Sequence, residues 1–238
     1  MRRFGGLFAV NGVTLTIALG ERRAILGPNG AGKTTLFNLI AGDYRPTAGR
    51  VLFFGEDVTR LPPRKRARRG LSRTYQTALL FLGLNVLDNL YLAVRGVVPR
   101  RMSVLRPRHD DRHLERAREL ARQVGLGSVT DQKVGELSHG VQRQLELGMA
   151  LASDPRLLML DEPAAGLSPA ERVTLTELLL QLHPSITVLL IEHDMDVALG
   201  VAQRVTVMHE GRVIADGAPD EIRDNQTVQD IYLGEHGA

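Results

Sequence analysis

The sequence of 238 residues predicts an α/β fold that is built on a parallel sheet and interrupted by a helical insert. Two short runs of apolar residues, 157–160 and 187–191, are continuous rather than alternating. That pattern is typical of strands buried on both faces of a parallel sheet. A helical pattern at 170–182 lies between them, so strand and helix alternate in this part of the chain.

The middle of the chain has a different character, with helices predicted at 86–94, 111–124 and 142–151. Glu115–Arg118 and Glu119–Arg122 have the i,i+3 spacing that supports a polar helix. We therefore expect one domain whose α/β core comprises residues 1–76 and 154–238, with a helical subdomain over 77–153.

The first part of the chain also alternates strand and helix. Val13, Leu15 and Ile17 alternate with threonines, which predicts a half-buried strand. Later elements are expected as strands at 23–26, 51–54 and 73–75, a helix from Lys33 to near Gly42, and a short helix from Pro62-Pro63 to Gly70. Near the C-terminus, 205–208 and 212–215 flank Glu210-Gly211 and predict a hairpin.

The composition is that of an ordinary globular protein, with 43% hydrophobic residues, 24% charged residues and a net charge of +3. The sequence has no cysteine, which excludes disulfides, thiolate metal sites and cysteine nucleophiles. The most apolar window, 79–98, is interrupted by asparagine and charged residues, whereas a spanning helix needs about 20 apolar residues. The apolar stretch 4–10 after Arg2-Arg3 is too short and rich in glycine for a signal peptide.

Residues 27–34 carry the most specific motif, because Gly-Pro-Asn-Gly-Ala-Gly-Lys-Thr fits G-x-x-x-x-G-K-[ST] between a predicted strand and a predicted helix. The glycines let successive N–H groups curl around phosphate oxygens, and the helix N-terminus adds partial positive charge. Lys33 is expected at the β- and γ-phosphates and Thr34 at Mg²⁺. The candidate phosphate-binding residues are Asn29, Gly30, Ala31, Gly32, Lys33, Thr34 and Thr35.

Two carboxylates, Asp161 and Glu162, end the apolar strand at 157–160. Burying such a pair without a partner is costly, and a Mg²⁺ held by the phosphate loop would supply one. Asp161 is expected to hold the metal, and Glu162 to orient or deprotonate the attacking water.

Further motifs resemble the ATP-binding cassette (ABC) family. Residues 137–141, Leu-Ser-His-Gly-Val, are similar to its LSGGQ signature, and 165–168 stand where its D-loop lies. Gln76 resembles the Q-loop glutamine and His193 the switch histidine, while Phe4 has the spacing of the residue that stacks on adenine. The motifs cover the whole chain in family order. The sequence departs from the pattern at His139, Val141, Ser168 and in the short segment before Phe4.

The resemblance implies a P-loop NTPase with a RecA-like core, a small antiparallel β subdomain and a helical subdomain. It implies Mg-dependent ATP hydrolysis in a sandwich dimer, in which Ser138 and Gly140 contact the γ-phosphate bound to the partner. Glu162, His193, Gln76 and Lys33 would then be catalytic, and Gln76 would join Thr34 and Asp161 at Mg²⁺ and link the site to the transporter.

The chain is most similar in detail to the ATPases of branched-chain and hydrophobic amino acid importers, on Arg3-Phe-Gly-Gly-Leu, Arg73-Thr-Tyr-Gln and Ile231-Tyr-Leu-Gly-Glu. Urea or amide importers and the lipopolysaccharide-export ATPase are alternatives, and a soluble ABC ATPase is the alternative of a different class. The resemblance implies membrane permease subunits, a second ABC ATPase of the same or a related chain, and indirectly a substrate-binding protein. It places the chain at the cytoplasmic face of the inner membrane.

Two surface segments have competing interpretations. Residues 60–69 are strongly basic but lack an aromatic platform, so a solvated helix face near anionic lipid is favoured over a nucleic-acid patch, and no nucleic-acid partner is expected. The aliphatic stretch 77–84 is either core packing or a groove that receives a helix of the membrane subunit.

Overall fold

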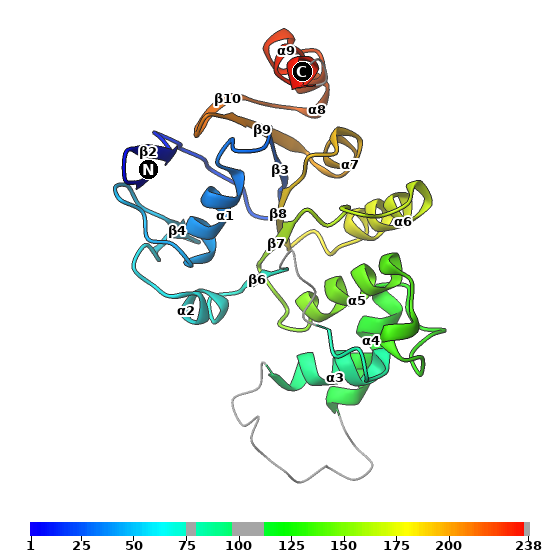
Figure 1. Cartoon of the computed structure of the whole chain (residues 1–238). Helices are drawn as coiled ribbons and strands as arrows, with labels where there is room; N and C mark the ends of the chain where they lie inside the picture. The colour runs from blue at the N-terminus through cyan, green and yellow to red at the C-terminus, as the bar shows by residue number, and fades with distance from the viewer. Residues whose placement is uncertain (75–79, 97–111, 236–238) are drawn as a thin grey trace.

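The computed structural model describes residues 1–74, 80–96 and 112–235. Its centre is a six-stranded sheet in the order β10-β9-β3-β8-β7-β6 (Figure 1). The strands are β3 (Arg22–Leu26), β6 (Leu71–Arg73), β7 (Leu157–Asp161), β8 (Thr187–Ile191), β9 (Arg204–His209) and β10 (Arg212–Gly217). All neighbours are parallel except β9 and β10, which form the antiparallel hairpin predicted around Glu210-Gly211.

The central strands are apolar throughout because both faces of the sheet are covered. Every residue of β7 and β8 is buried. Along β7, Leu158 and Leu160 pack into one hydrophobic cluster, whereas Met159 packs into the other. This alternation confirms the prediction from the continuous apolar runs.

Helices cover the two faces of the sheet. The helix α1 (Lys33–Ala41) lies on one face, and α6 (Pro169–Leu180) and α7 (Met195–Val201) lie on the opposite face (Figure 1). Gly42 ends α1 in the left-handed conformation, and its N–H donates to the carbonyl oxygen of Asn38. The predicted boundaries of α1 are therefore confirmed.

Short elements form an arm beside α1. They are the hairpin β1 (Arg2–Phe4) and β2 (Leu7–Val10), the hairpin β4 (Leu52–Phe53) and β5 (Glu56–Asp57), and the helix α2 (Pro63–Ala67). The sequence missed β1, β2 and β5 and placed β6 two residues too late, while Tyr75 lies outside the described residues. The strand predicted at 13–17 is wrong. Val13, Leu15 and Ile17 do pack on the core. The alternation of apolar and polar residues therefore reflects which side chains are buried, but within the described part of the chain this segment is not paired with another strand.

A lobe of helices projects from the sheet edge that carries β6 and β7 (Figure 1). It consists of α3 (Val86–Gly96), α4 (Arg112–Gln123), the 3₁₀ turn η1 (Val134–Glu136) and α5 (His139–Leu151). On α4, Glu115 pairs with Arg118 as predicted, but Glu119 pairs with Arg116. Two further helices, α8 (Pro219–Arg223) and α9 (Gln226–Glu235), lie beyond β10. Within the ranges that the structure describes, none of the helices is both long and apolar enough to cross a bilayer.

The basic segment 60–69 is not simply a solvated face, because Arg66 is completely buried. Its guanidinium donates to the carbonyl oxygens of Leu39 and Ile40 in the last turn of α1, and to those of Thr59 and Leu61. Burial lowers the pKa of Arg66 from its ordinary value. A cation in this position stabilises the carbonyl end of α1 and fastens α2 to it.

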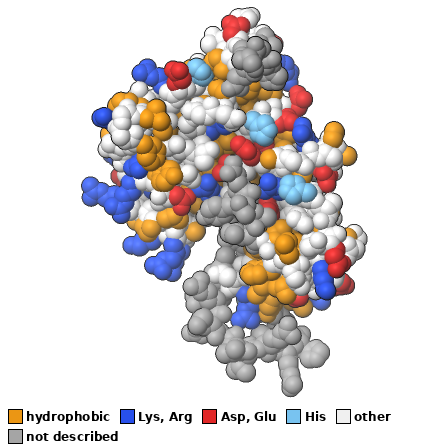
Figure 2. Space-filling view, viewed as in Figure 1, with side chains coloured by type: hydrophobic (Ala, Val, Ile, Leu, Met, Phe, Trp, Pro, Cys, Tyr) orange, Lys and Arg blue, Asp and Glu red, His pale blue; other side chains and the backbone are white. Residues whose placement is uncertain are grey.

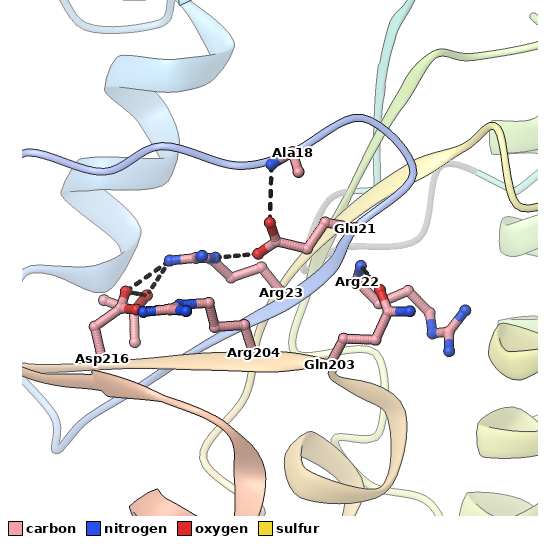
Figure 3. A network of polar contacts seen from close by, with 8 residues as sticks. Ala18, Glu21, Arg22, Arg23, Gln203, Arg204 and Asp216 are labelled. Atoms are coloured by element: carbon pink, nitrogen blue, oxygen red, sulfur yellow. Dashed lines mark hydrogen bonds and ion pairs between the residues drawn. The ribbon is translucent and has the colours of Figure 1, made fainter.

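A second buried arginine joins the beginning of β3 to the β9–β10 hairpin (Figure 3). Arg23 lies between two carboxylates, with Nε 2.6 Å from Glu21 Oε1 and Nη1 2.6 Å from Asp216 Oδ2. Arg204 contacts the other oxygen of Asp216 from the solvent side. Burial by itself would raise the pKa of Asp216, but the hydrogen bonds from Arg204 and Thr206 and the neighbouring arginine charges outweigh it and hold that pKa below its ordinary value.

Arg23→Ala is expected to lower the free energy of unfolding by about 3–5 kcal/mol, because it leaves partly buried carboxylates without their cation. Arg204→Ala is the matched control. Its side chain is 50% exposed, against 4% for Arg23, so it should cost less than about 1 kcal/mol. Urea denaturation measures both, and equal losses would contradict this account of the network.

The pKa of Asp216 also predicts how the free energy of unfolding changes at acidic pH. Asp216 has a lowered pKa in the folded state, so its contribution is complete above the ordinary value of 3.8 and is lost as the pH falls through the lowered folded value. The free energy of unfolding of the wild-type chain should therefore fall more steeply below about pH 4 than that of Asp216→Asn.

Candidate functional site: a phosphate loop at the end of the central strand

The phosphate loop connects β3 to α1 and requires glycine at two positions. Gly27 has φ +150° and Gly32 has φ +98°. A Cβ on Gly27 would lie 2.2 Å from the carbonyl oxygen of Met208, and one on Gly32 would lie 2.2 Å from that of Ala9. The loop is thus pressed between β9 and β2, and no residue with a side chain fits at either point.

Lys33 is buried within the loop at the first turn of α1. Its ammonium donates to the carbonyl oxygens of Gly27 and Pro28, the latter at 3.0 Å. Thr34 is exposed on the same turn. The loop therefore brings a cation, the N-terminus of α1 and a hydroxyl close together, as phosphate binding requires.

A pocket of about 760 Å³ opens over this loop. Phe4, Leu7 and Phe8 of the N-terminal hairpin form one wall, and Glu162 reaches it from the end of β7. Phe4 is 40% exposed, and its ring meets the edge of Tyr44 and lies 4.4 Å from the guanidinium carbon of Arg2. The remaining lining consists of Gly6, Ala9, residues 28–35 of the loop and the Glu210-Gly211 turn. Phe4 therefore offers a supported aromatic surface beside the phosphate loop, where the sequence placed the adenine platform.

The carboxyl end of β7 holds the two acidic residues in different environments. Asp161 is buried, and its Oδ2 accepts from Nη2 of Arg73 at 3.0 Å. Burial raises the pKa of Asp161, and the hydrogen bond from Arg73 opposes this. Glu162 has φ +48°, an uncommon conformation that turns the chain sharply, and its N–H donates to the carbonyl oxygen of Ile191.

The residues at this edge fit a bound Mg²⁺. Among the described residues, no donor reaches the buried Oδ1 atom of Asp161. A carboxylate oxygen and the Thr34 hydroxyl are both hard oxygen ligands of the kind that Mg²⁺ takes together with phosphate oxygens and water. Gln76, the third predicted metal ligand, lies outside the described residues.

The carboxyl end of β8 carries a buried glutamate beside the predicted switch histidine. Glu192 is completely buried, and its Oε1 accepts from the N–H of Ala164 at 2.9 Å. Its Oε2 lies 4.0 Å from Nδ1 of His193. Burial raises the pKa of Glu192, against the hydrogen bond from Ala164. His193 itself is exposed and does not line the loop pocket.

The signature residues are also outside that pocket. Ser138 caps the N-terminus of α5 by accepting from the N–H of Val141. Ser138 and Gly140 both donate to Glu171 of α6 in the same chain. The structure therefore unites Phe4, the loop and Glu162 in one pocket and brings Asp161 beside them through β7. Ser138, Gly140 and His193 lie outside this pocket.

The sequence assigned no role in the site to three residues that organise this region: Arg73, Glu171 and Glu192. Arg73 connects Asp161 with Asp43 and Asn38. A signal did exist for Glu171, because Ser168-Pro-Ala-Glu171 has the spacing of a capping box, and the structure forms it. Ser168 thus serves as the N-cap of α6.

Comparison with known proteins identifies the class. The profile of the ABC transporter family matches residues 10–165, and that of the branched-chain amino acid ATP-binding cassette transporter matches residues 212–238. The chain belongs to the ABC transporter family of ATP-binding proteins, and its fold is that of an ABC ATPase, which binds nucleotide and hydrolyses ATP.

Individual relatives are similar over nearly the whole chain. The high-affinity branched-chain amino acid transport ATP-binding protein BraF of Pseudomonas aeruginosa is 40% identical, over 98% of this chain and 94% of its own length. LivG of Escherichia coli, with the same description, is also 40% identical, over 99% and 95%. The crystal structure of the ADP conformation of MJ1267, an ATP-binding cassette of an ABC transporter, superposes with a TM-score of 0.86 at 31% identity, over 98% and 95%.

Gly32→Ala is expected to lower the stability of the chain by about 3 kcal/mol or more and to weaken ATP binding, because the new Cβ collides with the backbone of β2. Gly30→Ala is the control, since it has φ +81° but open space around it, and should cost only about 1–2 kcal/mol of backbone strain. Thermal unfolding and titration with a fluorescent ATP analogue compare the two variants.

Proposed function

We propose that this chain is the ATP-hydrolysing subunit of a membrane importer for branched-chain or other hydrophobic amino acids. The observation that carries the ATPase site is the pocket in which Phe4, the phosphate loop and Glu162 meet. The choice of substrate is supported by the family profile at 212–238 and by the similarity to BraF and LivG.

In this mechanism the adenine stacks on Phe4, and the triphosphate follows residues 29–35 to the N-terminus of α1. Lys33 exchanges its loop carbonyl partners for the β- and γ-phosphate oxygens. Thr34, Asp161 and Gln76 would hold Mg²⁺, which when bound offsets charge on the phosphate oxygens. Glu162 accepts a proton from the attacking water, or orients it, at the open end of β7.

The dimer completes the site. Ser138 and Gly140 of one cassette donate to the γ-phosphate held by the other, and His193 contacts the same phosphate. A second copy or a related ATPase can fill the partner's place. The solved structure of the cassette MJ0796, a dimer bound to ADP and Pi, supports this arrangement; it superposes with a TM-score of 0.74 at 25% identity, over 90% of this chain and 91% of that one.

Glu162→Gln is expected to lower kcat for ATP hydrolysis by about 100-fold or more while ATP binding is retained, because the amide cannot accept the proton. Glu210→Gln is the control, since Glu210 lines the same pocket from the β9–β10 turn and has no role in the mechanism. Steady-state ATPase assays decide: unchanged turnover in Glu162→Gln would show that the base has been assigned wrongly.

The docking surface for the membrane subunit is proposed to be a groove between the arm and the helical lobe. The groove has a volume of about 1360 Å³ and is lined by Phe53 and Phe54, by Gly96 and Met149 of the lobe, and by several arginines, among them Arg64, Arg68 and Arg156. Figure 2 shows basic side chains gathered along the left edge of the molecule, around the position of α2 in Figure 1. The lining holds five arginines against two acidic residues, Glu56 and Asp154, and this excess of positive charge suits a helix that carries acidic side chains.

The exposed part of the aliphatic stretch is a second candidate contact for the membrane subunit. Phe81 and Leu82 are 53% and 54% exposed, while Asn89 fixes the backbone of Phe81 by two hydrogen bonds. Hydrophobic side chains are also visible over the helical lobe in Figure 2. An apolar surface that is held rigidly in solvent supports the interface interpretation over core packing. Binding to the membrane subunit would place the chain at the cytoplasmic face of the membrane.

Export of lipopolysaccharide is the second candidate. LptB of Acidithiobacillus ferridurans, a lipopolysaccharide export system ATP-binding protein, is 37% identical over 95% of this chain and 90% of its own length. The two functions differ in their companions, because an importer works with a substrate-binding protein and an exporter does not.

Affinity purification of the tagged chain from gently solubilised native membranes is expected to recover multi-span permeases, a second ATPase and a substrate-binding protein. The double variant Arg64→Glu/Arg68→Glu should lose the permeases by charge repulsion, whereas Arg122→Glu, an exposed position on α4 outside the groove, should keep them. Mass spectrometry identifies the companions. Recovery of ribosomes, of nucleic acid or of no membrane protein would overturn the transport role and leave the ATP site intact.

A further inference from the structure

Glu171 occupies the donors of the signature motif within its own chain. Its Oε1 accepts from Oγ of Ser138 at 3.2 Å and from the N–H of Gly140 at 3.1 Å. The approach is so close that a Cβ on Gly140 would lie 2.3 Å from Oε1. The glycine of the signature is thus required already for this internal contact.

The other half of the carboxylate holds Glu171 in position. Oε2 accepts from the N–H of Ser168 at 2.9 Å and from its Oγ at 2.8 Å, which completes the capping box of α6. The hydrogen bonds from Ser168, with those from Gly140 and Ser138, lower the pKa of Glu171. The group is therefore an anion at neutral pH, and its two oxygens bridge the D-loop segment and the signature.

A second contact joins the same two segments. The left-handed Gly166 faces the ring of His139, because a Cβ on this glycine would lie 3.3 Å from His139 Cε1. The signature and residues 166–171 consequently form one packed surface in the isolated chain.

The contact of Glu171 with Ser138 and Gly140 competes with the γ-phosphate contact of the proposed function, on which this inference rests. A hydroxyl carries one hydrogen and a backbone amide carries one, so Ser138 and Gly140 cannot donate fully to Glu171 and to a γ-phosphate together. The carboxylate and the phosphate are both negatively charged, and they would occupy the same side of the α5 N-terminus.

We propose that Glu171 is an internal substitute for the γ-phosphate, which the partner's ATP must displace from Ser138 and Gly140 before the two cassettes close. Glu171 then acts as a positioning residue for nucleotide engagement. It keeps the signature loop shaped and its donors satisfied in the free chain, and it raises the ATP concentration that closure requires.

The test is ATP-driven dimerisation of the full chain in a Glu162→Gln background, where slow hydrolysis lets the closed state accumulate. Sedimentation velocity at increasing ATP gives the midpoint of dimer formation. Adding Glu171→Gln should lower that midpoint about 3- to 10-fold, since a neutral amide is the weaker hydrogen-bond acceptor and does not repel phosphate. Glutamine keeps the size of the side chain and an acceptor for Ser168.

Glu221→Gln is the matched control, because Glu221 is also the third residue of a helix and accepts from the N–H of the capping residue, Ala218, but has no contact with the signature among its described hydrogen bonds. It removes the same charge and should leave the midpoint unchanged. Glu171→Asp is a second test variant. It keeps the charge but withdraws it by one methylene, and it too should lower the midpoint.

The possible outcomes distinguish a failure of the displacement proposal from a failure of the proposed function. A midpoint that is unchanged or raised in both Glu171 variants would overturn the displacement proposal alone; a raised midpoint would mean that Glu171 preshapes the loop for the partner's nucleotide. If the Glu162→Gln chain binds ATP but forms no dimer at any ATP concentration, then Ser138 and Gly140 do not contact the partner's ATP. That result would also overturn the displacement proposal. Failure to bind ATP at all would overturn the proposed function itself.

Discussion

The backbone of the phosphate loop is the constraint on which the rest of the structure depends. A Cβ on Gly27 or Gly32 would collide with the carbonyl oxygen of Met208 or Ala9, so the loop lies tightly between the β9–β10 hairpin and the N-terminal hairpin. Gly211 adds a hydrogen bond to the carbonyl oxygen of Ala31. The loop can present its amide groups only while these neighbours hold their places, which explains why so much of the chain surrounds one short turn.

Parallel pairing then decides which side chains meet the loop. Because β3, β7 and β8 run in the same direction, their carboxyl ends lie at one edge of the sheet, and each ends in a functional segment. Asp161 ends β7 and Glu162 follows it, and Glu192 and His193 follow β8. The hydrogen bond from the N–H of Ala164 to Glu192 links the ends of the two strands next to the D-loop segment and His193.

The strongest predictions from the sequence were those with a local physical cause. Continuous apolar runs located β7 and β8, and glycine spacing located the loop and the end of α1. The strand predicted at 13–17 failed because alternation reports burial, whereas a strand also needs a paired neighbour. Arg66 was taken for a surface residue, since nothing in a run of basic residues shows which one meets the carbonyl end of a distant helix.

The sequence by itself determined the class of fold, the phosphate loop and the identity of the acidic residues at the strand ends, because each depends on residues that are neighbours in the chain. Tertiary structure alone decided what those residues touch. Glu171 lies 31 residues beyond Gly140 and 33 beyond Ser138, yet its carboxylate occupies both of their donors. Only the meeting of the N-termini of α5 and α6 in the folded chain creates that contact, and no local pattern of residue types specifies where two helix N-termini will meet.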